Sequence, residues 1–177
     1  MRGTRNGVRR FQPGDVEPVP GLFEIAAAPG SPARGGTLGD GAGVNPRNRL
    51  SPRVTVRLIR TLEADLAQHQ HSLSDVLPVA GIDEGTLRRR LAGPDEAGRV
   101  VGKTGTYGDY GASALAGAFR SPQHGTVYFA VLNRGIPVVP ARRRQDAFLR
   151  GLLQAIGSEP WPYRRDDAPA FTRAVVE

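Results

Sequence analysis

The stretch GKTGT, residues 102–106, brings together groups that could bind the carboxylate end of a peptide. Lys103 is the only lysine among the 24 Lys and Arg residues of the chain. A compact ammonium can sit beside a hydroxyl or a carboxylate where a planar guanidinium does not fit. Thr104 adds a hydroxyl donor, and Gly105 has no side chain to block a peptide lying along the strand. The backbone N–H of Thr106 could meet a developing oxyanion. The stretch therefore predicts a strand-edge site.

Two other interpretations of these residues remain open from the sequence alone. A phosphate-binding loop requires G-x-x-x-x-G-K-[ST], but position 97, where its first glycine belongs, is Ala97. The residues after Lys103 are also poor helix formers, whereas that loop leads into a helix. In the other interpretation, Lys103 is an ordinary solvated residue at a sheet edge.

Three blocks of sequence resemble one family of enzymes. GKTGT, followed by GASALAGAF and TVYFAVLNRG, resembles the K-T-G motif of the penicillin-binding proteins. DGAGVNPRNRLSP (40–52) and LPVAGIDEGTLRRRL (77–91) resemble two further blocks of their class C, low-molecular-mass branch. These are the D-alanyl-D-alanine carboxypeptidases/endopeptidases, and the three blocks stand in the family's order.

The resemblance implies roles for four residues. Lys103 would bind the terminal carboxylate of the substrate, and Thr104 would donate a hydrogen bond to it. Gly105 would give clearance, and the Thr106 N–H would form half of the oxyanion hole. It also implies a peptidoglycan stem peptide ending in D-Ala-D-Ala as substrate, β-lactams as ligands of the complete fold, a periplasmic or extracytoplasmic location, and no cofactor or metal.

The nucleophile motif of that family, S-x-x-K, is absent, because position 100 is Val100 and Lys103 is the only lysine. S-x-N is absent too; Ser74-Asp75-Val76 lacks the asparagine. We therefore expect the C-terminal portion of such an enzyme, a truncated or degenerate copy whose N-terminal half is missing, and we find no signal peptide. The alternative hypothesis is a non-catalytic module that binds peptidoglycan peptides or anionic wall.

The pattern of apolar residues predicts an α+β fold, namely part of the β-lactamase/transpeptidase-like fold. It indicates helices at 51–70, 86–91 and 141–156, and strands at 100–107, 113–120 and 126–133, the last three forming an antiparallel meander. A short strand is also expected near 22–27. The expected organisation is an irregular segment at 1–36, the enzyme-like domain at 37–158 and an extended tail at 159–177. We expect the apolar faces of the 51–70 and 149–156 segments to be core, and an exposed sheet face where a layer is missing.

Composition narrows the remaining function classes. The net charge is +7 with a pI of about 10.9, but almost all basic residues are arginine and aromatic residues make up only 6%. These features favour a coding bias toward arginine, rather than nucleic-acid binding, as the origin of the positive charge. The chain has no cysteine and therefore no disulfide or thiolate site. His69 and His71 are two residues apart and would point in different directions on a helix, which argues against a metal site.

Overall fold

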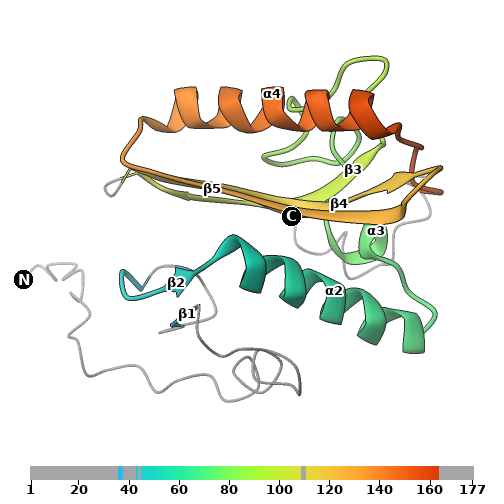
Figure 1. Ribbon diagram of the computed structural model, residues 1–177, viewed down its shortest axis with the longest axis horizontal. Helices are drawn as coiled ribbons and strands as arrows, with labels where there is room; N and C mark the ends of the chain where they lie inside the picture. Colours follow the sequence, from blue (N-terminus) through green and yellow to red (C-terminus); the bar gives the residue numbers. More distant parts are fainter. Residues whose placement is uncertain (1–35, 38–42, 44, 109–110, 164–177) are drawn as a thin grey trace, which may run out of the picture.

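The computed structural model describes residues 36–37, 43, 45–108 and 111–163. A three-stranded antiparallel sheet runs in the order β3 (Val100–Tyr107), β4 (Ala112–Ser121) and β5 (Gly125–Arg134). Helix α4 (Val138–Ile156) covers one face, and helix α2 (Pro52–Gln68) crosses the other (Figure 1). The predicted α+β meander between two helices is confirmed. The strand expected near 22–27 lies outside the described residues.

Three small elements complete the described structure. Strands β1 (Gly36–Thr37) and β2 (Arg49–Leu50) pair with each other, and helix α3 (Leu73–Val76) follows α2. None of the helices described is long and apolar enough to cross a membrane.

Between the sheet and α4 lies the larger core. The alternation of each strand sends Val100, Leu115 and Phe129 to this side, where they meet Leu149 and Leu153 of α4. The amphipathic pattern of α4 buries four residues, and Gly157, at a φ of 71°, stands at the end of the helix as expected. This face of the sheet is closed.

The opposite face is covered less completely. Helix α2 begins as expected, with Ser51 as N-cap accepting from the Val54 amide and with Pro52 as its first residue. The expectation that its apolar face would be core is wrong, because no residue of α2 is buried and Leu62 is 37% exposed. Ile59 and Leu66 pack only partly against a second, smaller core. A cavity separates the rest of this face from the sheet.

Residues 86–91 form consecutive turns instead of the predicted short helix. The amide of Arg90 donates to the carbonyl of Leu87, a bond of tight-turn spacing, and Leu91 takes a φ of 50°. This bent path buries Leu87, Arg90 and Leu91 together. Tertiary packing therefore outweighs the local helix propensity.

The first residues of the predicted tail pack against the sheet. Glu159 forms a bridge with Arg120 of β4, and Trp161 is buried with Val101 and Ala118. The Trp161 indole N–H donates to the Arg99 carbonyl, and the Tyr163 hydroxyl donates to Asp83. The two aromatic residues therefore anchor this end of the chain to the sheet.

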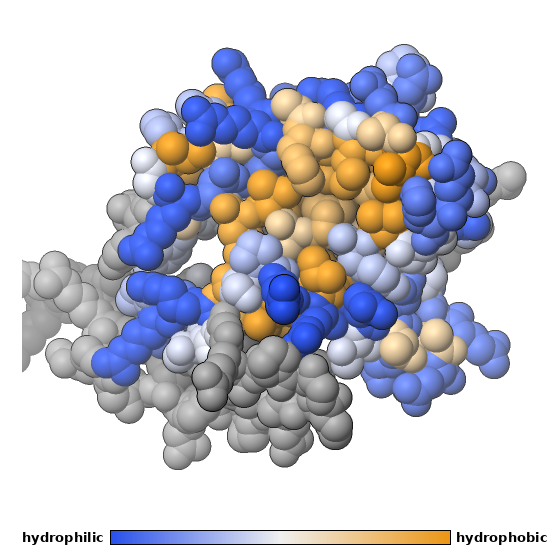
Figure 2. Space-filling view, in the orientation of Figure 1, coloured by the Kyte–Doolittle hydropathy of each residue, from blue (hydrophilic) through white to orange (hydrophobic). Residues whose placement is uncertain are grey.

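Apolar side chains also reach the surface between α4 and α2, at the level of the sheet (Figure 2). Leu132 of β5 is 37% exposed.

Candidate functional site

Strand β3, which carries GKTGT, is an outer strand of the sheet. In an antiparallel strand, alternate residues direct both backbone polar groups to the same side. The Gly102 amide donates to the Pro78 carbonyl, and the Val100 carbonyl accepts from the Ala80 amide, so the even-numbered residues point to the outer edge. The same alternation directs the N–H groups of Thr104 and Thr106 outward. Past Gly102, no strand in the described part of the chain pairs with this edge.

Lys103 lies on the face of the sheet opposite to α4. Its side chain is exposed, and its Nζ donates to the carbonyl oxygen of Thr104 at 2.7 Å. Gly105 lies on the same face, where an added Cβ would come no closer than 3.6 Å to Ala114. The Lys103 ammonium and the open space at Gly105, both expected from the sequence, therefore lie on the same face of the strand.

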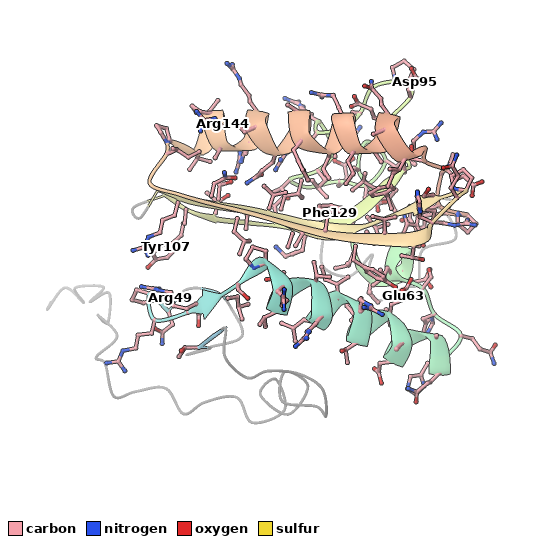
Figure 3. The ribbon with its side chains drawn as sticks, in the orientation of Figure 1. Arg49, Glu63, Asp95, Tyr107, Phe129 and Arg144 are labelled. Atoms are coloured by element: carbon pink, nitrogen blue, oxygen red, sulfur yellow. The ribbon has the colours of Figure 1, made fainter. Side chains whose placement is uncertain are left out.

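These residues border a cavity of about 1180 Å³ between the sheet, α2 and β2. The lining includes all of β3 from Lys103 to Tyr107 and apolar side chains such as Leu58, Leu62 and Leu132. Tyr107 and Arg49, which also line it, lie on facing elements (Figure 3). A peptide with apolar side chains and one anionic end suits a cavity of this composition.

The hydroxyls of Thr104 and Thr106 face α4, and each has a partner that the sequence did not suggest. The Oγ1 atoms of Thr104 and Thr86 are 2.6 Å apart. The guanidinium of Arg142, from the first turns of α4, donates to the Thr106 hydroxyl at 3.1 Å. Both contacts join residues far apart in sequence, so no local pattern in the sequence predicted either of them.

Behind these contacts lies a buried polar network. Arg90 pairs with Asp146 at 2.6 Å and donates to the Gln145 side chain at 2.9 Å. Gln145 in turn donates to the side chains of Ser113 and Asn133. The network ties the 86–91 turns, α4 and the sheet together, which fixes Thr86 and Arg142 beside β3.

The other candidate residues lie elsewhere. His69 ends α2, and His71 lies 3.7 Å from Asp75. Within the described ranges, no group of three or more His, Cys, Asp or Glu side chains could hold a metal ion. Asp109 and Tyr110, the hairpin residues after the motif, are outside the described residues.

Comparison with known proteins identifies the family of this chain. The sequence profile of the D-Ala-D-Ala carboxypeptidase 3 (S13) family matches residues 30–153. The chain belongs to this S13 peptidase family. The match includes β3 and its GKTGT stretch, as the sequence resemblance predicted.

One curated relative of the S13 chain is penicillin-sensitive carboxypeptidase A of Dictyostelium discoideum, 26% identical over 103 residues. That alignment covers 55% of this chain and 19% of the relative. The chain therefore spans about a fifth of the length of the curated relative that it matches.

Solved structures with the same fold come from Bdellovibrio bacteriovorus. The penicillin G-acylated Bd3459 predatory endopeptidase, in complex with immunity protein Bd3460, superposes with a TM-score of 0.69 at 23% identity. The Bd0816 predatory endopeptidase, in complex with the same immunity protein, gives 0.67 at 24%. These alignments cover 78% and 79% of this chain but 39% and 37% of the two endopeptidases.

Proposed function

We propose that this chain forms the carboxylate-binding strand and one side of the oxyanion hole of a serine-type D-alanyl-D-alanine carboxypeptidase/endopeptidase. The substrate is a peptidoglycan stem peptide ending in D-Ala-D-Ala, which places the activity outside the cytoplasm. The observation that carries the proposal is the open outer edge of β3, where GKTGT borders the cavity.

In this proposal the peptide lies along the edge of β3 as an added strand. The outward N–H groups of Thr104 and Thr106 are available to its backbone, and Gly105 leaves room for it. The Lys103 ammonium attracts the terminal carboxylate, to which the hydroxyls of Thr104 and Thr106 donate. The Thr106 N–H stabilises the oxyanion that forms when the scissile carbonyl is attacked.

The attack itself requires a serine activated by a base. The 177 residues contain no S-x-x-K, because the one lysine is Lys103 and the residue three positions before it is Val100. This chain therefore supplies binding and oxyanion stabilisation, and we expect no covalent β-lactam adduct on it. Penicillin acylation belongs to the complete family fold.

Binding of a D-Ala-D-Ala peptide to the 177-residue chain tests the proposal directly. Diacetyl-L-Lys-D-Ala-D-Ala is titrated by calorimetry or NMR into the wild type and the Lys103→Ala variant, with the L-Ala-L-Ala diastereomer as the control ligand. We expect the wild type to prefer the D,D peptide and the variant to bind it about tenfold more weakly, as for loss of a charge-assisted hydrogen bond. Equal affinity of the two proteins, or of the two peptides, would refute the proposal.

A further inference from the structure

The Arg142 guanidinium adds a second positive charge beside the GKTGT strand. Helix α4 starts at Val138, so Arg142 lies in its first turns, on the side that faces the sheet. Its Nη2 donates to the Oγ1 of Thr106. Lys103 lies on the opposite face of the same strand, so the two cations flank the open edge.

This contact also determines the direction in which the Thr106 hydroxyl can donate. A hydroxyl has one proton to donate and lone pairs to accept with. Because Arg142 can only donate, the Thr106 oxygen accepts from it, and the Thr106 proton stays available for another acceptor. The Thr106 hydroxyl can therefore donate this proton to an anion at the edge of β3. An anion is the preferred acceptor, since a hydrogen bond to a charged group is stronger than one to a neutral group.

In the part of the chain that the structure describes, Arg142 forms no ion pair with an acidic side chain. Among the described residues, no carboxylate oxygen lies within ion-pair distance of its guanidinium. Asp146, one turn further along α4, is bound to Arg90 instead. Within the described residues, the positive charge of Arg142 therefore has no acidic partner at the strand.

We infer that Arg142 is a specificity-determining residue for the terminal carboxylate of the peptide. It orients the Thr106 hydroxyl toward that carboxylate and supplies positive charge from the α4 side, while Lys103 supplies it from the cavity side. The inference rests on the proposed function, because it names a further residue of the same binding edge.

A comparison of two ligands on two proteins separates charge recognition from a structural role. The ligands are diacetyl-L-Lys-D-Ala-D-Ala with a free carboxylate and the same peptide as its C-terminal amide. The proteins are the wild type and Arg142→Gln. We expect Arg142→Gln to weaken binding of the carboxylate peptide by about 5–10-fold, as for loss of one charged hydrogen bond, and to leave the amide peptide within about twofold.

Arg144 provides the matched control, because it is an exposed arginine of the same helix (Figure 3). Arg144→Gln removes the same charge and should change the affinity for either peptide by less than about twofold. Arg142→Lys keeps the charge without the planar fork and should restore part of the preference for the carboxylate. The melting temperature of each variant verifies that the fold is retained.

The outcomes distinguish the inference from the function on which it rests. If the wild type shows no preference for the D,D peptide, the proposed function fails. If the wild type binds as proposed but Arg142→Gln weakens both ligands equally, or neither, the role of Arg142 is overturned while the proposed function stands.

Discussion

Helices α4 and α2 flank the same sheet but cover it in different ways. Helix α4 buries Ala141, Gln145, Leu149 and Leu153, whereas α2 buries no residue. The α4 side has a continuous core and a satisfied polar network. The α2 side has a cavity of about 1180 Å³.

The difference separates the scaffold of this chain from its candidate site. Strand β3 directs side chains to both faces of the sheet: Val100 is part of the core under α4, and Lys103 faces the cavity under α2. A rigid strand backed by a closed core can present an open edge in a fixed position. Substitutions on the α4 side should therefore change stability, and substitutions on the α2 side should change it much less.

The largest effect should come from Arg90, whose ion pair with Asp146 is mostly buried, with side chains 10% and 15% exposed. Arg90→Met leaves the Asp146 carboxylate without its partner and should lower the free energy of unfolding by about 3–5 kcal/mol. Urea denaturation measures this change. Arg88→Met is the control, because its pair with Glu84 is exposed, and it should cost less than about 1 kcal/mol. Equal losses would contradict the assignment of Arg90 to the scaffold.

A pair of leucine truncations compares the two helices directly. Leu149 of α4 is fully buried, and Leu149→Ala should cost about 2–5 kcal/mol because it leaves a cavity in a packed core. Leu62 of α2 already borders open space and is 37% exposed, so Leu62→Ala should cost about 1 kcal/mol or less. Thermal unfolding of both variants gives the comparison. A loss at Leu62 as large as at Leu149 would mean that α2 packs as tightly as α4.

The sequence predicted well what is encoded locally. The β-branched run of β5 and the four-residue spacing in α2 gave the elements within a few residues, and GKTGT located the open edge. The sequence could not show that the apolar face of α2 borders a cavity, since periodicity reports an apolar face and not what covers it. The contacts of Thr86 and Arg142 with β3 depend on the bent 86–91 turns and the placement of α4, for which no local signal exists.

Two glycines test the closed and open parts of the sheet separately. A Cβ on Gly117 would lie 2.0 Å from the Val101 carbonyl oxygen, which is backbone and cannot move aside easily. Gly117→Ala should therefore cost about 1–3 kcal/mol. Gly105→Ala meets nothing closer than 3.6 Å, so stability should change by less than about 0.5 kcal/mol.

On the proposed function, Gly105→Ala should nevertheless weaken binding of the D-Ala-D-Ala peptide, because its methyl group occupies the cavity side of the edge. Thermal unfolding and peptide titration of the two variants are compared with the wild type. If Gly105→Ala is destabilised, or if it binds the peptide as the wild type does, the separation between a scaffold under α4 and a binding site at the open edge would be contradicted.

The smallest effect concerns the attachment of α2 to the sheet. The Tyr128 hydroxyl of β5 donates to the Glu63 carboxylate of α2. Burial, and then this hydrogen bond and the charge of Glu63, raise the pKa of Tyr128 to about 12 from its usual 10. Because the native pKa is above the unfolded one, the stabilisation is complete below pH 10 and is lost as the pH rises from 10 to about 12.

Glu63→Gln should therefore lower the pKa of Tyr128 but leave it above 10, because burial, the largest cause, remains. Absorbance of tyrosinate against pH measures the shift, and Tyr128→Phe identifies the component that belongs to this residue. The accompanying loss of stability at pH 7 should be small, since both groups are partly exposed to solvent. An unchanged titration would show that α2 is not held to β5 through this pair. The attachment of α2 to the sheet would then depend on other contacts, among them the partly buried Ile59 and Leu66.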